Sequence, residues 1–178
     1  RLSGIIGGKS PVHPNDHVNL GQSSNDVIPT ALHISALKDI ARGLLPHLNT
    51  LGQVLGEKAL QGGDIRKIGR THLQDAVPMF LGDEFSAYAR QVELSVSRIK
   101  NASEGLRELA LGGTAVGSGV NTPPGFAGAV IQKINRHLDM EFREAENHFE
   151  AQAARDAAVE MSGTLKSVAV SLMKIADD

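Results

Sequence analysis

Apolar residues recur at alternating spacings of three and four positions in three long segments of the chain. This spacing places the apolar side chains along one side of an α-helix, as in a coiled coil or a long helical bundle. Stripes of this length predict helices of roughly 25–35 residues. The stripes consist of Ile34, Leu37, Ala41, Leu44, Leu48, Leu51 and Leu55; of Phe85, Tyr88, Val92, Ile99, Ala102, Leu106 and Leu109; and of Ala154, Ala158, Met161, Leu165, Val168, Leu172 and Ile175.

Proline and glycine residues divide these segments from one another. Pro46 lies within the first stripe, where a proline should kink the helix or split it in two. Pro78 is placed to open the second long helix, and Gly112-Gly113 to end it. After the third stripe the chain reaches Asp178 without a glycine or proline that would stop the helix. We therefore expect an all-α fold, an elongated bundle of long helices, and a chain that is a fragment of something longer.

Composition supports the helical reading and excludes several classes of function. Of 178 residues 41% are hydrophobic but only 3% aromatic, so the core is built from aliphatic side chains that suit helix-on-helix packing. The net charge of −2 offers no basic surface for nucleic acid or membrane, and no apolar run approaches the ~18 residues that span a bilayer. The absence of cysteine excludes disulfides, thiolate nucleophiles and cysteine-based zinc sites, and fits a reducing compartment such as the cytoplasm.

Polar residues concentrate in two short islands between the apolar stripes. In the first island Ser23, Ser24 and Asn25 supply two hydroxyls and an amide immediately before a helix start. Free backbone N–H groups and the positive end of the helix dipole meet there, which favours a bound carboxylate. On spacing alone, an ordinary helix N-cap explains these residues at least as well. Asp26 is more simply a cap residue than a catalyst.

The same island begins with His13-Pro14-Asn15-Asp16-His17. A metal site using His13, Asp16 and His17 would be chemically possible, but this is not a recognised ligand spacing. A second anion site or a solvent-facing turn is favoured, and no metal is expected.

In the second island Thr71 and His72 precede an apolar stretch. A histidine beside a threonine can move a proton near neutral pH while the threonine binds a carboxylate, although a buried histidine bonded to backbone is an equal alternative. The glycine-rich residues 112–119 follow a helix and lack a Gly-Lys-Ser/Thr ending, so they are not a nucleotide loop. Four further histidines lie on helical segments and are expected at the surface: His33, His47, His137 and His148.

Several long motifs, in order along essentially the whole chain, closely resemble class II fumarate hydratase of the fumarase/aspartase superfamily. They are His13-Pro14-Asn15-Asp16-His17-Val18-Asn19, Gln22-Ser23-Ser24-Asn25-Asp26, Gly69-Arg70-Thr71-His72-Leu73-Gln74-Asp75-Ala76-Val77-Pro78, Leu111-Gly112-Gly113-Thr114-Ala115-Val116-Gly117 and Asn147-His148-Phe149-Glu150-Ala151-Gln152. The resemblance implies reversible anti addition of water to fumarate, giving L-malate in the tricarboxylic acid cycle. It also implies a cofactor-free homotetramer, in the cytoplasm or the mitochondrial matrix, whose active sites each draw on three subunits.

By this resemblance the islands acquire roles. His72 is the catalytic proton donor or acceptor, and the substrate carboxylates are bound by Ser23, Ser24, Asn25 and Thr71. A secondary dicarboxylate site is formed by His13, Asn15 and Asp16, with Pro14 between them. The dianionic aci-carboxylate formed when the C3 proton leaves must be held by preorganised donors.

One motif of the family has no counterpart here. The mobile loop Gly-Ser-Ser-x-Met-Pro-x-Lys-x-Asn, with the serine thought to be the carbon-acid base, matches nothing in the chain. We therefore expect residues 1–178 to be a helical central-domain fragment without the N-terminal segment and C-terminal domain of the family. Aspartate ammonia-lyase is the alternative enzyme. At the motif positions where the two enzymes usually differ, however, this chain has His13, Ser24 and His72, which resemble the fumarase motifs. A non-catalytic helical assembly module is the alternative of another class.

The missing loop leads to a direct prediction. The purified 178-residue chain should not turn over L-malate, because the base and several carboxylate ligands are absent. The measurement is fumarate absorbance with no host enzyme present, and detectable turnover would contradict the fragment interpretation.

Overall fold

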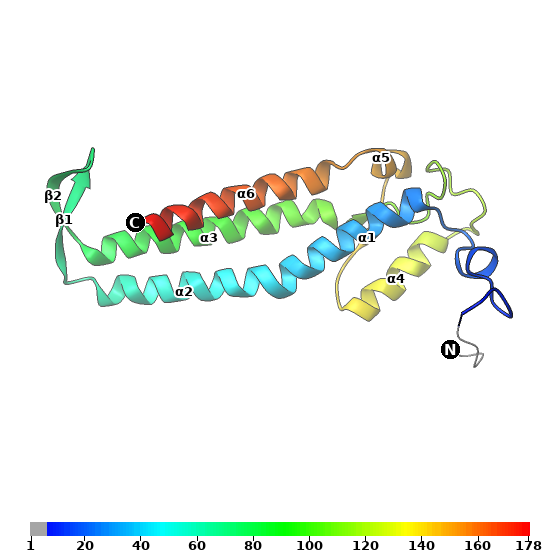
Figure 1. Ribbon diagram of the computed structural model, residues 1–178, viewed down its shortest axis with the longest axis horizontal. Coiled ribbons are helices and arrows are strands. Elements are labelled where there is room, and N and C mark those ends of the chain that lie inside the picture. The colour runs from blue at the N-terminus through cyan, green and yellow to red at the C-terminus, as the bar shows by residue number, and fades with distance from the viewer. Residues whose placement is uncertain (1–6) are drawn as a thin grey trace. The chain divides into compact units, whose positions relative to one another are not determined.

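A computed structural model describes residues 7–178 of the chain (Figure 1). These residues form two compact units. The first unit consists of residues 7–35 and 105–156, and the second of Ala36–Glu104 and Ala157–Asp178. Within the described range no helix is both long and apolar enough to cross a membrane.

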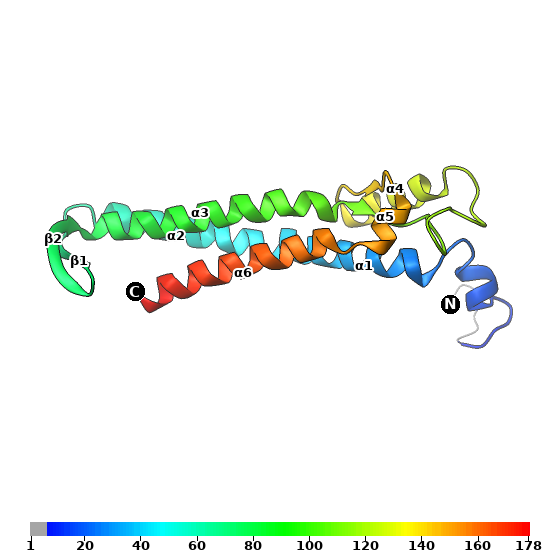
Figure 2. The same cartoon turned by 90° about the horizontal axis from the view of Figure 1, so that it is seen from above.

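The second unit is built from long helices that lie alongside one another in both views (Figures 1 and 2). They are α2 (Leu45–Gln61), α3 (Leu81–Leu106) and α6 (Asp156–Asp177). The residues of the predicted stripes face the interior, which confirms the helical pattern. Removing each large aliphatic side chain from water contributes about 1.5–3 kcal/mol. The buried stripe residues of this unit include Leu37, Leu48, Leu55, Tyr88, Val92, Ile99, Ala102, Met161 and Val168.

Helix lengths follow the prediction in α3, which has 26 residues, but α6 is shorter at 22. The first stripe forms one helical path through α1 (Ser24–Asp39), a π-helical turn η2 (Ile40–Leu44) and α2. Pro46 lies in the first turn of α2, and the N–H of Leu45 bonds to the carbonyl of Ile40. The proline cannot donate a helical hydrogen bond, and the wider π turn precedes it. The expected interruption at Pro46 is therefore a change of helical pitch without a break.

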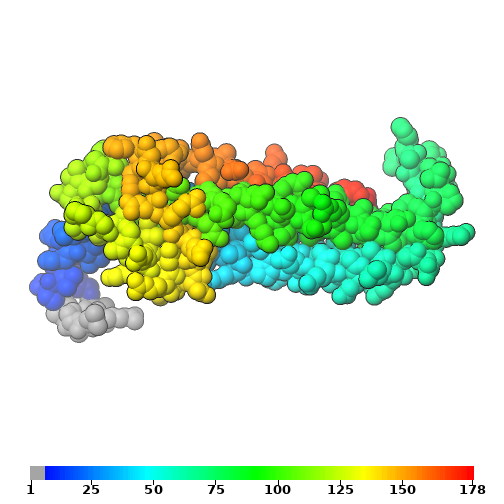
Figure 3. All heavy atoms as spheres, turned by 180° about the vertical axis from the view of Figure 1, so that it is seen from behind, coloured from blue at the N-terminus to red at the C-terminus, as the bar shows by residue number. Residues whose placement is uncertain are grey.

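A β-hairpin, which the sequence analysis did not predict, joins α2 to α3 and projects from them in Figure 3. Its strands are β1 (Arg66–Thr71) and β2 (Gln74–Phe80), paired antiparallel. Pro78 lies in β2 opposite Ile68, so the expectation that it opens the helix is wrong. In a two-stranded sheet every strand has a free edge, and there a proline costs no ladder hydrogen bond.

The first unit carries short elements around the start of α1. They are the turn η1 (Pro14–Val18), β3 (Glu108–Leu109), α4 (Phe126–Leu138), β4 (Arg143–Glu144) and α5 (His148–Ala153). β3 and β4 pair in parallel. Because the chain leaves helical geometry to make this pair, α3 ends at Leu106, before Gly112-Gly113.

Two glycines let the base of the hairpin close against α2. The N–H of Gly82 donates to the carbonyl of Gly62 at 2.9 Å. A Cβ atom at Gly82 would overlap the carbonyl oxygen of Ala59 and would lie 3.0 Å from the nitrogen of Gly63. Both neighbours are backbone atoms, which cannot rotate aside.

Gly82→Ala should therefore lower the free energy of unfolding by about 1–3 kcal/mol, the usual cost of overpacking. Gly163→Ala is the matched control, since Gly163 lies inside α6 with open space around its Cα. There the better helix propensity of alanine should raise stability by about 0.5–1 kcal/mol. Urea unfolding of both variants would measure the difference, and equal effects would contradict the close approach at Gly82.

A polar cluster ties α3 to the end of α6. The Tyr88 hydroxyl donates to Oδ2 of Asp178 at 2.9 Å, and the Lys174 ammonium, which also bonds Asp178, lies 4.8 Å from the centre of the Tyr88 ring. Burial raises the pKa of Tyr88, and the hydrogen bond to Asp178 and the charge of Glu84 raise it further. Glu84 also pairs with Lys67 of the hairpin at 2.5 Å.

Since Tyr88 is the only tyrosine of the chain, phenolate absorbance reports it alone. We expect a midpoint above the ordinary value of about 10 in the folded chain and a return to about 10 in urea. A raised folded pKa contributes stability that is present below pH ~10 and is lost as pH rises above it. Tyr88→Phe should therefore flatten the loss of stability in that range, whereas a native midpoint near 10 would contradict the buried cluster.

Candidate functional site

The start of α1 is capped by Ser23. Its Oγ accepts a hydrogen bond from the N–H of Asn25 at 3.2 Å, and its carbonyl accepts from the N–H of Val27 at 3.0 Å. In return, Oδ1 of Asp26 accepts from the N–H of Ser23 at 2.9 Å. The bond from the N–H of the N-cap residue to the side chain at N3 is that of a capping box, whereas Oγ of Ser23 bonds the N–H at N2. The cap interpretation is thus confirmed, and it leaves Ser24 and Asn25 in the first helical turn, where the helix dipole is positive.

Asp26 does more than cap the helix. It is completely buried, and its second oxygen, Oδ2, accepts from the N–H of Gly112 at 3.1 Å and from the N–H of Thr114 at 3.0 Å. Both donors belong to residues 111–117, here called the glycine loop. Backbone N–H groups of a tight loop commonly gather around an anion. In this loop that anion is the chain's own carboxylate, which accounts for the glycine-rich stretch without a nucleotide.

Asn25 also contacts the glycine loop. Its Nδ2 donates to the carbonyl of Ala115 at 2.7 Å, which sets the orientation of the amide and directs Oδ1 away from that carbonyl. Near this helix start lies a cavity of about 230 Å³, and four of its five lining residues have polar side chains. The cavity is lined by Asn19, Gln22, Ser23, Ser24 and Val27. Hydroxyls, amides and a helix N-terminus are suited to hydrogen-bonding a small carboxylate.

The glycine loop is held from behind by α5. The Nε2 of Gln152 donates to the carbonyl of Thr114 at 2.7 Å, and Nε2 of His148 lies 3.1 Å from the carbonyl oxygen of Leu111. Gly112 has φ +100°, and a Cβ there would lie 2.5 Å from the Cβ of Ala127. The side chain of His148 is 18% exposed, so its expected surface position is wrong.

His33 is also misplaced by the sequence reading, since its Nδ1 bonds the carbonyl of Glu108 at 2.9 Å in a half-buried position. A helical segment does not by itself place a histidine at the surface, because the face that it occupies depends on packing against neighbouring loops.

The His13 turn is held by its own side chains. Nδ1 of His13 accepts from the N–H groups of Asn15 and Asp16 at 3.2 and 3.1 Å. An accepting Nδ1 carries no proton, so its 3.3 Å approach to Oδ2 of Asp16 is not an ion pair. Nε2 then bears the hydrogen and can donate to a ligand. In residues 7–178 no group of three or more histidine or acidic side chains could hold a metal ion.

Thr71 and His72 lie in the other unit, at the tip of the hairpin. His72 and Leu73 form its two-residue turn, with φ values of +53° and +59°. Both positive values define a type I′ turn, which usually takes asparagine and glycine, so these two residues are strained. Thr71, His72 and Leu73 are exposed, which contradicts the alternative of a buried histidine bonded to backbone.

The structure thus places Ser23 and Ser24 on the lining of one cavity, in the same unit as His13, whereas the neighbouring Asn25 does not line the cavity and bonds the glycine loop at Ala115. Thr71 and His72 form a separate group in the second unit. Sequence reasoning missed the contributions of Gly112, Thr114 and Gln152, because their contacts join segments that are far apart in the chain.

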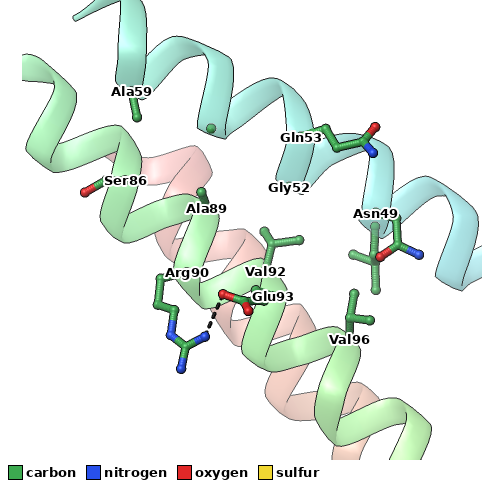
Figure 4. Close-up of a pocket in the computed structure, with 12 residues that line it drawn as sticks. Asn49, Gly52, Gln53, Ala59, Ser86, Ala89, Arg90, Val92, Glu93 and Val96 are labelled. Atoms are coloured by element: carbon green, nitrogen blue, oxygen red, sulfur yellow. Dashed lines mark hydrogen bonds and ion pairs between the residues drawn. The ribbon is translucent and has the colours of Figure 1, made fainter. Parts of the chain in front are cut away.

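A second hollow lies between α2 and α3, with a volume of about 510 Å³ (Figure 4). Small side chains form much of its wall, and Arg90 pairs with Glu93 at its rim. The small lining residues are Gly52, Gly56, Ala59, Ser86 and Ala89. The shape is an open groove with an apolar floor that includes Val92 and Val96.

Known proteins resemble this chain over nearly all of its length. It is 56% identical over 177 residues to "Fumarate hydratase, mitochondrial" of Danio rerio, covering 99% of this chain and 35% of that protein. It is 53% identical over 168 residues to "Fumarate hydratase class II" of Corynebacterium glutamicum, covering 94% of this chain and 36% of that protein. The chain therefore spans about a third of the length of these relatives.

Solved structures agree in fold. The class II fumarase from Schistosoma mansoni superposes with a TM-score of 0.91 at 41% identity, covering 99% of this chain and 40% of that one. The fumarate lyase:delta crystallin from Brucella melitensis bound to cobalt gives a TM-score of 0.89 at 36% identity, covering 99% of this chain and 38% of that one. Residues 1–178 match the lyase family throughout, and the chain therefore belongs to that family, with class II fumarate hydratases among its relatives.

Proposed function

We propose that this chain is the central helical part of a class II fumarate hydratase, which interconverts fumarate and L-malate. The observation that carries the proposal is the cavity lined by Ser23 and Ser24 at the start of α1, next to Asn25, whose amide is held in one orientation by Ala115. The relatives that share more than half of their aligned residues with this chain bear the same enzyme name.

In this proposal Ser23, Ser24 and Asn25 bind a substrate carboxylate. Hydroxyl and amide donors at a positive helix end hold negative charge without having to reorganise when the C3 proton leaves. A preorganised site of this kind stabilises the aci-carboxylate more than the substrate, and this differential binding accelerates the reaction.

His72 is the proposed proton donor or acceptor, with Thr71 as a further carboxylate ligand. The strained type I′ turn supports this role, because such strain persists where the backbone must present a side chain in one direction. The exposed tip is open to a proton-transfer partner that residues 7–178 do not supply at hydrogen-bond distance. We propose that the partner and the carbon-acid base come from other parts of the assembled enzyme.

We propose self-association into a homotetramer in which several copies complete each active site. The groove between α2 and α3 supports this, since its small side chains would admit another helix closely. Large apolar residues that lie exposed on the helices of the second unit also support self-association, because contact with other copies would remove them from water. These residues are Val54, Leu60, Leu94, Val159, Val170 and Met173.

The turn of His13, Pro14, Asn15 and Asp16 is the proposed secondary dicarboxylate site, with the protonated Nε2 of His13 as one donor. No cofactor is required by this chemistry. The proposed location is the cytoplasm, or the mitochondrion that the Danio rerio protein has in its name.

The test is an assay of the complete polypeptide that contains this chain. It should produce fumarate from L-malate and none from L-aspartate. His72→Asn should lower kcat by about 10²–10⁴-fold, the usual contribution of a positioned acid or base. Fumarate absorbance measures both reactions.

His137→Asn is the matched control, because His137 is exposed in the last turn of α4. It should leave turnover unchanged. Fumarate formed from L-aspartate would move the protein to the ammonia-lyase branch, and silence with both substrates would favour the non-catalytic assembly module.

A further inference from the structure

Asp26 stands between the proposed substrate-binding residues and the glycine loop. Its Oδ1 holds the N–H of Ser23 and its Oδ2 holds the N–H groups of Gly112 and Thr114, so one carboxylate fixes two segments about 86 residues apart. With none of its surface exposed, the carboxylate has no water to compensate for a lost partner. Breaking one of these bonds therefore leaves a buried carboxylate oxygen without one of its hydrogen bonds, which costs free energy.

Asn25, the residue before Asp26, makes a further contact with the glycine loop. Its amide donates to the carbonyl of Ala115, which follows directly after Thr114. The direction in which the Asn25 amide points therefore depends on where the glycine loop places that carbonyl. Asp26 secures the same loop at two N–H groups, and so it controls the position of the acceptor that orients its neighbour.

The loop is secured at Thr114 from both sides. Its N–H is bound by Asp26, its carbonyl is bound by Gln152, and its φ of +57° is unfavourable for a β-branched residue. A strained residue persists only where its surroundings determine its conformation. Oε1 of Gln152 is buried and bonds to no residue in the described range, so the polar role of this side chain rests on its bond to Thr114.

We infer that Asp26 and Gln152 are positioning residues, which act through Thr114 of the glycine loop to orient Asn25 for the substrate carboxylate, while Asp26 also holds the backbone of Ser23 directly. The contacts run from Gln152 to the carbonyl of Thr114, from the N–H of Thr114 to Asp26, and from the adjoining Ala115 to Asn25. The inference rests on the proposed function for the identity of the ligand, whereas the coupling itself is a property of the fold.

The test compares three variants of the complete polypeptide. Asp26→Asn keeps the side-chain shape but replaces one acceptor oxygen with an NH₂ group that faces N–H donors. Gln152→Glu replaces the donor to Thr114 with an acceptor and lies on α5, away from the helix start. Asp39→Asn is the matched control, with the same charge change at the exposed C-terminal end of α1.

Hydrogen exchange gives the readout that needs no substrate. In Gln152→Glu, amide exchange should speed up in residues 111–117 and also in residues 22–26, although Gln152 bonds only the former. Asp39→Asn should change neither segment. Faster exchange confined to residues 111–117 would overturn the coupling, and this arm decides the matter even where Asp26→Asn fails to fold.

Kinetics test the consequence for substrate. Asp26→Asn should lower kcat/KM for L-malate at least about tenfold, with a lower kcat as well as a higher KM, because the carboxylate-binding residues bind the substrate and bind the transition state more strongly. Gln152→Glu should act in the same direction, and the double variant should lose less than the product of the two, since both act through Thr114. A folded Asp26→Asn enzyme with unchanged kcat/KM would overturn the inference. A wild-type protein that is inactive with L-malate would overturn the proposed function alone. Hydrogen exchange would still test whether residues 111–117 and 22–26 are coupled.

Discussion

The carboxylate of Asp26, buried with only backbone N–H groups as partners, is the interaction on which the first unit depends. Burying an unpaired carboxylate costs several kcal/mol, and three charge-assisted hydrogen bonds offset that cost. The partners come from the cap of α1 and from the glycine loop, so neither segment can take its conformation without the other.

The contact with Asp26 also explains the glycine at position 112. The loop can offer its N–H groups to Asp26 only by turning through positive φ and by lying directly against Ala127 of α4. Thr114 lacks the freedom of glycine and remains in the left-handed region because Asp26 and Gln152 hold both its polar backbone atoms. Among the non-glycine residues with positive φ in the described range, Thr114, His72 and Leu73 lie in segments to which the proposed chemistry belongs. Asn121 and Asp139 lie elsewhere, and their residue types tolerate this conformation better.

The second unit obtains its stability differently, mainly from aliphatic packing along α2, α3 and α6. The rigid helices carry a hairpin whose tip presents Thr71 and His72 to solvent. Such a design places polar side chains at the ends of stiff elements, where other copies of the chain or other parts of the polypeptide can meet them. The small side chains of the α2–α3 groove suit the same purpose, since they allow a close helix contact.

The helices and the polar islands could be predicted from sequence alone. Their periodicity of three and four is a local property, and so is the polar capping signal in residues 23–26, where α1 begins. The motifs also carried the resemblance to fumarate hydratases, since they are continuous in sequence. The prediction that Pro78 opens a helix was wrong, because a proline is equally tolerated at the free edge of a hairpin strand.

Tertiary structure alone decided what those islands contact. The sequence near Asp26 does not predict that its second oxygen binds Gly112 and Thr114, because these residues reach Asp26 only through the folding of the intervening chain. His33 and His148 are half-buried for the same reason: their carbonyl partners at Glu108 and Leu111 come from distant segments. Local patterns determine which elements form, whereas long-range hydrogen bonds, which leave no periodic trace, determine which side chains those elements hold in place.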